Sequence, residues 1–195
     1  MTAVYCALPL VRAKCPNQRG VADHSPGPVA AMQIRPFVPP DLPILKQMTV
    51  EAFDGVSIDQ GIERVHGEIA GHDWKWRKAR HLDDDLRRDP QGFFVLTDDA
   101  DRPVGYVSTW CDHEAGLGHI PNLVVDTAVR GQGWGRRLLE HALAHFKSCG
   151  LTHAKIETLA QNAVGNHLYQ DLGFLEVARQ VHFVARLGES SHSSE

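Results

Sequence analysis

The segment VRGQGWGRRLL, residues 129–139, combines residue types suited to holding a phosphate group. Glycine lacks a Cβ atom and tolerates positive φ, so a ligand can approach the main chain closely. Unsatisfied N–H groups at the start of a following helix carry partial positive charge, and arginines add charge-assisted contacts. The segment therefore predicts a phosphate-binding loop, formed by Arg130, Gly131, Gly133, Gly135 and Arg136.

Two common phosphate patterns do not fit this loop. The P-loop, GxxxxGK[ST], needs a second glycine where Arg136 stands. The dinucleotide pattern GxGxxG needs glycine or alanine at that same place and begins directly after a strand. Here residues 126–130 separate the loop from the strand before it. A nicotinamide-dependent dehydrogenase is therefore disfavoured.

A third pattern, RxxGxG, is met by Arg130, Gly133 and Gly135. It resembles the acetyl-coenzyme A loop of the GNAT superfamily of N-acetyltransferases. The segment NAVGNHLYQDLGF, residues 162–174, resembles that family's later motif NxxAxxLYxxxGF. Gly165 stands where alanine is usual, which is expected to loosen a short helix by up to ~1 kcal/mol. The resemblance covers roughly residues 32–187, and the two motifs occur in the family's order.

The resemblance implies acetyl-coenzyme A as cosubstrate and no metal. It implies that the loop holds the pyrophosphate and that backbone groups of the preceding strand pair with the pantetheine arm. Pro121 cannot donate to a strand ladder, which suits a local break where the thioester enters. The implied coenzyme-binding residues are Leu123, Val124, Val125, Arg130, Gly131, Gln132, Gly133, Trp134, Gly135, Arg136, Asn162 and Tyr169.

The resemblance also implies three catalytic residues. Tyr169 is the expected general acid for the leaving thiolate. An amine with a pKa near 10 is protonated at neutral pH, so a base or a water chain must take its proton. Glu157 matches the base position of the ribosomal-protein alanine acetyltransferase branch, and His119 matches a strand position where histone-type members carry glutamate. Glu157 is slightly preferred, and both stay candidates.

The acceptor amine is not identified by the sequence. A protein N-terminus, a lysine and a small-molecule amine all fit direct transfer in a ternary complex, and a non-catalytic acyl-coenzyme A sensor is the alternative. Trp74 and Trp76 either contact the substrate or pack a helix onto the sheet. The acidic run at 83–85 and the net charge of −4 argue against nucleic acid as a partner and favour a solvated helix of mixed charge.

The cysteines and histidines are expected to have no special chemistry. Cys6, Cys15, Cys111 and Cys149 form no CxxC pair and no metal-ligand spacing, so free thiols in a cytoplasmic protein are predicted. His141 and His145 have the i, i+4 spacing of a zinc pair but lack the glutamate of HExxH. We expect them to be helix surface residues.

The elements that position these residues follow from periodicity. Residues 1–31 are expected to be a disordered leader, 32–187 one domain that is a monomer or homodimer, and 188–195 a flexible tail. No apolar run approaches the roughly 20 residues of a membrane span. The predicted fold is α+β, with a mostly antiparallel twisted sheet of six to seven strands flanked by four helices. Strands are predicted at 32–38, 92–98, 104–112, 119–125, 153–159, 174–179 and 180–187, and helices at 41–53, 58–88 with breaks at the glycines 67 and 71, 134–149 and 162–172.

Overall fold

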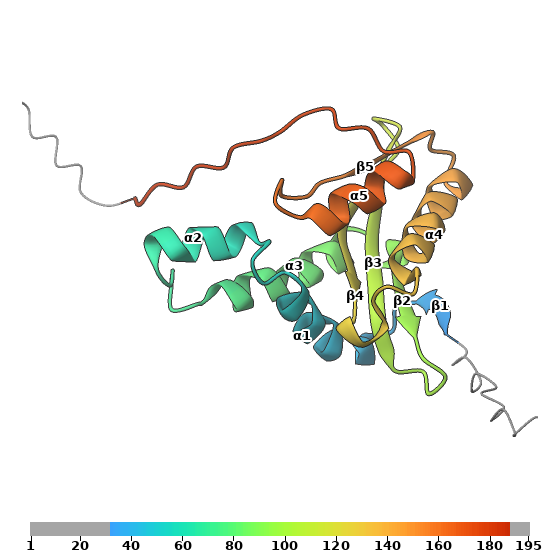
Figure 1. Ribbon diagram of the computed structural model, residues 1–195, viewed down its shortest axis with the longest axis horizontal. Helices are drawn as coiled ribbons and strands as arrows, with labels where there is room; N and C mark the ends of the chain where they lie inside the picture. The colour runs from blue at the N-terminus through green and yellow to red at the C-terminus, as the bar shows by residue number, and fades with distance from the viewer. Residues whose placement is uncertain (1–31, 188–195) are drawn as a thin grey trace, which may run out of the picture.

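A computed structural model describes residues 32–187 (Figure 1). The expected leader and tail, 1–31 and 188–195, lie outside the described residues. Within residues 32–187, no helix is long and apolar enough to cross a bilayer. The elements are β1 (Gln33–Pro36), α1 (Leu42–Ala52), α2 (Ile58–His66), α3 (Trp74–Arg88), β2 (Phe93–Thr97), β3 (Pro103–Asp112), β4 (Leu117–Val125), α4 (Trp134–Ser148), β5 (His153–Ile156) and α5 (Ala163–Asp171).

The five strands form one sheet in the order β1-β2-β3-β4-β5. Neighbours are antiparallel from β1 to β4, and β5 lies parallel to β4 after the crossover through α4. This confirms the predicted mixed α and β class and the mostly antiparallel sheet. The polar helical region predicted at 58–88 is split into α2 and α3, so five α-helices flank the sheet in the described part of the chain instead of four.

Both faces of the sheet are covered (Figure 1). Phe94 and Leu96 of β2 pack with α4 on one face, whereas Phe93 and Val95 pack with α1 and α3 on the other. Since successive side chains of a strand point to opposite faces, a strand covered on both sides has a continuous apolar sequence, as in the FFVLT of β2.

Helix α4 lies very close to β4. A Cβ atom on Gly118 would be 2.5 Å from the ring of Phe146, so any larger residue at this position would force the helix away from the sheet. The buried residues of α4 are Leu138, Leu139, Ala142 and Phe146, at the spacing expected of an amphipathic helix. The close approach holds the C-terminal part of α4 against β4.

Strands β4 and β5 separate partway along β4. They pair only from Leu117 opposite His153 to Ile120 opposite Ile156, while β4 continues to Val125. Pro121 is the first residue beyond the paired part, as its missing N–H group predicts. Among the described residues, no strand pairs with the β5 side of residues 121–125. The divergence therefore leaves the backbone groups on this side of β4 without a partner strand among the described residues.

The predicted final strands, 174–179 and 180–187, are wrong: this segment contains no strand, and the sheet of the described residues has five strands instead of six or seven. The junction between Arg179 and Gln180 carries no glycine, asparagine or aspartate, which a tight hairpin turn needs. The segment runs as an extended chain away from α5 and past α2, where the carbonyl of Val184 lies 3.2 Å from Nε2 of His66 (Figure 1).

Candidate active site

The glycine loop is built as a helix N-terminus with free amides. Gly131 and Gly133 have φ of +76° and +84°, the left-handed region that glycine alone adopts readily. The first hydrogen bond of α4 runs from Arg137 N to Gly133 O, at 3.2 Å. The amides of Trp134, Gly135 and Arg136 precede it, and none finds an acceptor among the described residues. They are free to bind an anion.

Gly135 has a different role from the other two glycines. It lies within the first turn of α4 with ordinary helical φ, and a Cβ there would be 3.3 Å from Leu168 Cδ2 of α5. Arg136 also reaches α5, where its guanidinium lies 3.3 Å from the carboxylate of Asp171. These contacts hold the start of α4 against the helix that carries Tyr169.

Only some backbone groups of β4 point toward the open side left by the divergence of β5. The amide of Asp126 donates to Val104 O of the β3 side at 2.8 Å, and donors alternate in direction along a strand. The amides of Leu123 and Val125 therefore point toward the open side, whereas that of Val124 points toward β3. Of the three predicted pantetheine contacts, Leu123 and Val125 are placed to make them. Arg130 Nε already donates to the carbonyl of Val125, at 2.9 Å.

Tyr169 lies on α5 among apolar neighbours. Its ring packs on the α4 side of the core and is 6.3 Å from the ring of Phe174. Burial raises the pKa of the phenol above its ordinary value of 10.0. Within residues 32–187 the hydroxyl forms no hydrogen bond with the protein. A protonated, unengaged hydroxyl suits a proton donor.

Asn162 is already engaged by its own helix. It is the N-cap of α5: its Oδ1 accepts from Gly165 N at 3.1 Å, and its Nδ2 donates to Thr158 Oγ1 at 2.9 Å. A Cβ at residue 165 would lie 2.6 Å from that Nδ2 atom, so the glycine there leaves room for the cap. To contact the coenzyme as expected, the Asn162 side chain would have to do so while it also caps the start of α5.

His119 and Glu157 lie close together on the face of the sheet opposite α4. His119 pairs in register with Lys155, and Glu157 follows two residues later, 2.7 Å from the Lys155 ammonium. The His119 ring stacks on Trp110 at 3.8 Å. Burial, followed by the charge of Lys155, lowers the pKa of His119 below its ordinary value of 6.5. The side chain of Glu157 is 65% exposed.

A buried polar cluster between α3 and β4 was missed by the sequence reasoning. Ser108 Oγ and Asn122 Nδ2 donate to Asp85 Oδ2 at 2.6 and 2.7 Å. Lys78 Nζ donates to Asn122 Oδ1 at 2.8 Å. The expectation of a solvated α3 is wrong for Lys78, which is only 7% exposed. The available signal was spacing: Lys78 and Asp85 share the helix face of the buried Trp74.

The α3–β4 cluster has perturbed charges. Burial lowers the pKa of Lys78 to about 8, although Asp59 and Asp85 attract its ammonium. Burial raises the pKa of Asp85 despite the hydrogen bonds it accepts. Burial and the nearby Lys78 lower the pKa of His81. Such perturbed groups gathered in a concave region are typical of functional sites.

A cavity of about 280 Å³ opens beside this cluster and beside the β4–β5 divergence. Its lining residues are His81, Asp84, Asp85, Arg88, Pro121 and Asn122. Arg88 also covers the ring of Trp110, on which His119 stacks. The cavity, His119 and the open strand edge are therefore neighbours, an arrangement with room for a second substrate.

The two tryptophans differ in role. Trp74 is 7% exposed and lines a second cavity, of about 470 Å³, together with Gln60, Glu63 and Arg64. Trp76 is 44% exposed and stacks on His72 at 3.6 Å. Trp74 therefore packs helix α3 against its neighbours while one edge remains open to the second cavity.

Cys111 and Cys149 are free thiols, as predicted for these two. Burial, with the neighbouring Cys149 thiol and Asp89, raises the pKa of Cys111 to about 12. A thiol that stays protonated is a poor acyl carrier, which agrees with direct transfer. His141 and His145 are half-buried instead of lying on the open helix surface, because both pack edge-on against Phe94.

The comparison with protein families decides which of the phosphate patterns applies. The model described as "Acetyltransferase (GNAT) family" matches residues 59–174, from α2 through the glycine loop to the end of the second motif. The chain belongs to the GNAT acetyltransferase family. The matched region contains the glycine loop, the open edge of β4 and Tyr169.

Relatives and structural neighbours in the GNAT family extend this likeness. A mycothiol acetyltransferase of Segniliparus rotundus is 29% identical over 150 residues, which cover 70% of this chain and 55% of that protein. The ribosomal protein bS18-alanine N-acetyltransferase of Escherichia coli is 40% identical over 55 residues, 28% of this chain and 37% of that protein. The chain spans about half the length of the mycothiol acetyltransferases it matches.

A solved GNAT structure confirms the fold. The Paia N-acetyltransferase of Thermoplasma acidophilum, determined in complex with coenzyme A, superposes with a TM-score of 0.60 at 20% identity. The superposition covers 74% of this chain and 90% of that one.

Proposed function

We propose that this GNAT protein is an N-acetyltransferase that moves the acetyl group of acetyl-coenzyme A directly onto a primary amine. The observation that carries the proposal is the meeting of three features at the β4–β5 divergence: free amides at the start of α4, an unpaired strand edge, and Tyr169. Each matches one part of the cosubstrate or one step of the transfer.

The cosubstrate fits the two open backbone elements. The pyrophosphate is held by the N–H groups of Trp134, Gly135 and Arg136, where the helix dipole favours an anion. The amide-containing pantetheine arm lies along β4 and pairs with Leu123 and Val125 as an added strand would. This places the thioester near Pro121, at the mouth of the 280 Å³ cavity.

The acceptor amine enters from the α3 side. Asp84 and Asp85 line the cavity together with a single arginine, Arg88, so an incoming ammonium group is attracted there. A protein N-terminus, a lysine and a small-molecule amine all carry such a group. The mycothiol and bS18 acetyltransferases are named for different acceptors, so family likeness leaves the choice among these three open.

The chemistry requires three proton transfers. The base takes one proton from the ammonium, and the free amine attacks the thioester carbonyl carbon. As the carbon–sulfur bond breaks, Tyr169 donates its proton to the departing thiolate, and the nitrogen of the new amide bond gives up its second proton, which restores the phenol. His119 is the base that the structure favours, because its lowered pKa keeps it neutral at pH 7 beside the cavity wall. Glu157 stays a candidate, although it is exposed and paired with Lys155.

Two measurements test the function. Acetyl-coenzyme A at 100 times its dissociation constant is expected to stabilise the protein by about 2.7 kcal/mol, seen as a raised melting temperature, whereas NAD has no effect. A panel of peptides with free N-termini, lysine peptides and small amines is then screened for release of the coenzyme thiol. Thiol release that depends on one amine supports an enzyme. Coenzyme binding without turnover on any amine identifies the rival, a non-catalytic sensor, and stabilisation by NAD alone contradicts both.

A further inference from the structure

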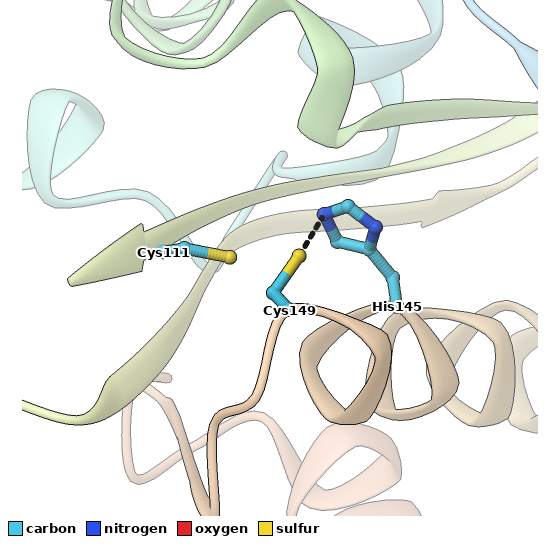
Figure 2. Close-up of side chains that lie close together, drawn as sticks. All are labelled: Cys111, His145 and Cys149. Atoms are coloured by element: carbon cyan, nitrogen blue, oxygen red, sulfur yellow. Dashed lines mark hydrogen bonds between the residues drawn. The ribbon is translucent and has the colours of Figure 1, made fainter. Parts of the chain in front are cut away.

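Three side chains that can bind a metal meet at the C-terminal end of α4. The Sγ atoms of Cys111 and Cys149 and a ring nitrogen of His145 all lie within 4.8 Å of one another (Figure 2). Cys149 Sγ is 3.8 Å from His145 Nε2. Around a tetrahedral zinc ion, bond lengths of about 2.3 Å to sulfur and 2.0 Å to nitrogen place sulfur and nitrogen about 3.5 Å apart. The cluster therefore needs only a small contraction to enclose an ion.

The fold holds the three groups in place before any ion binds. His145 and Cys149 are four residues apart on the last turn of α4, and Cys149 N donates to His145 O at 3.0 Å. Cys111 comes from β3, where it pairs with Gly118. The ring of His145 packs edge-on against Phe94 at 5.1 Å, which restricts its rotation. Figure 2 shows the sulfur of Cys111, on the strand, directed toward Cys149, and the sulfur of Cys149 directed toward the ring of His145.

The surroundings favour a cation. The C-terminal end of a helix carries a partial negative charge, and Cys149 is the C-cap of α4. The carboxylate of Asp89 adds a negative charge near Cys111. All three ligands are half-buried, so an ion can reach them from solvent. Two thiolates and an imidazole form a donor set that suits zinc.

We propose that Cys111, His145 and Cys149 bind one zinc ion, with water in the fourth position. Binding releases the two thiol protons to solvent, because the ligands are thiolates. The sequence offered His141 and His145 as a zinc pair, which the missing HExxH glutamate argued against; the proposed partners of His145 are instead Cys149 and Cys111 of β3. The ion would fasten α4 to β3.

The zinc site is separate from the acetyl-transfer site. It lies at the opposite end of α4 from the glycine loop, and a helix of 15 residues is about 22 Å long. Zinc binding is therefore independent of the proposed function, and each can fail without the other. A disulfide between Cys111 and Cys149 is the competing use of the same thiols.

Cobalt titration tests the site in the full chain. The Cys6→Ser/Cys15→Ser background removes the two other thiols, and the protein is reduced with a phosphine and stripped with a chelator. One equivalent of Co²⁺ is expected to produce thiolate-to-cobalt charge-transfer absorption and the intense visible bands of a tetrahedral site. Equimolar Zn²⁺ is expected to displace it.

Variants assign the ligands. Cys111→Ser and Cys149→Ser each are expected to lose part of the charge-transfer band and to weaken zinc binding more than tenfold, as is His145→Ala. His141→Ala is the matched control, because it packs on the same Phe94 ring but lies outside the cluster, and it is expected to bind normally. Circular dichroism checks that each variant is folded.

Three outcomes would overturn the zinc site. These are no saturable one-to-one binding by the reduced protein, binding that Cys111→Ser leaves unchanged, or loss of two thiols to a disulfide in air with no metal uptake under reduction. Acetyl-coenzyme A binding, measured on the same samples, is expected to be the same with and without zinc.

Discussion

The surroundings of Tyr169 suit it to the step proposed for it, which is donation of a proton to the leaving thiolate. Its phenol stays protonated at neutral pH because burial raises its pKa, and its hydroxyl is free of protein partners among the described residues. The helix that carries it is tied to the glycine loop through the Arg136–Asp171 pair and the contact of Leu168 with Gly135. The proposed proton donor is thus held at a fixed place relative to the loop that we propose binds the pyrophosphate.

Tyr169→Phe is expected to lower kcat by about 100-fold, since removal of a general acid costs on that order. Coenzyme binding is expected to change little, because the ring and its packing on the core remain. Steady-state thiol release gives kcat, and calorimetric titration with coenzyme A gives the dissociation constant. An unchanged kcat with intact binding would show that Tyr169 is not the acid.

The pH profile distinguishes the two base candidates. Because the pKa of His119 is lowered from 6.5, the ring is neutral at pH 7 and activity should fall only as the pH drops through that lowered value. His119→Gln is expected to reduce kcat/KM by about 100-fold and to abolish this acid limb. Glu157→Gln, the matched variant on the same sheet face, is expected to keep it. The reverse result assigns the base to Glu157, and an intact limb in both excludes both.

Lys78 offers a stability test of the buried α3–β4 cluster. Its pKa of about 8 in the folded protein lies below the ordinary 10.5, so the cost of burying its charge is full below pH 8 and disappears as the pH rises through 10.5. Relative to Lys78→Met, the free energy of unfolding of the wild type is expected to rise by about 2 kcal/mol between pH 8 and pH 10.

Urea denaturation of both proteins at the two pH values measures this difference, and the comparison cancels the groups that titrate in both. A wild type that loses stability relative to Lys78→Met over the same interval would mean that the ammonium of Lys78 is favourably paired instead of desolvated.

At the scale of the element, the turn before α4 owes its shape to backbone conformation. Gly131 and Gly133 are left-handed, and a Cβ at either would touch nothing within 4 Å. The need for glycine there is therefore one of φ and of ligand access, not of crowding by the protein. At Gly135 the reason is the opposite, because α5 lies against it.

Gly133→Ala is expected to cost about 1–2 kcal/mol of stability, the strain of a left-handed alanine, and to weaken coenzyme A binding at least tenfold. Gly116→Ala is the matched control: Gly116 has φ of +69° with open space around it, in the turn between β3 and β4. It is expected to cost similar stability and to leave binding unchanged. Equal weakening by both would indicate that the loop's conformation is not specific to the ligand.

At the scale of the whole molecule, periodicity predicted most elements because their environments are simple. FFVLT reads as a strand covered on both faces, and the amphipathic spacing of Leu138, Ala142 and Phe146 predicts α4. The final hairpin failed because alternating apolar residues indicate a strand only when a neighbour pairs with it. Phe183 and Leu187 alternate correctly and yet are 91% and 97% exposed.

The residues of the candidate site likewise fall into those that a local pattern predicts and those that depend on contacts between distant segments. Its glycine loop and Tyr169 lie in local motifs, so their order along the chain was sufficient to find them. The contact between Asp85 and Asn122 spans 37 residues, and Cys111 meets Cys149 across a similar separation. Such pairs depend on how β3 and β4 sit between α3 and α4, which no local pattern contains.

The open edge of β4 also determines how freely the amino-acid sequence can vary at positions 123 and 125. Main-chain amides are the same in every residue type, so a ligand read by the backbone of Leu123 and Val125 places no demand on their side chains. The only constraint on those two side chains is that they pack against the core on the α4 face. Other apolar residues at positions 123 and 125 should therefore be tolerated without loss of ligand binding. Proline is the exception, because it has no backbone N–H group to donate to the ligand.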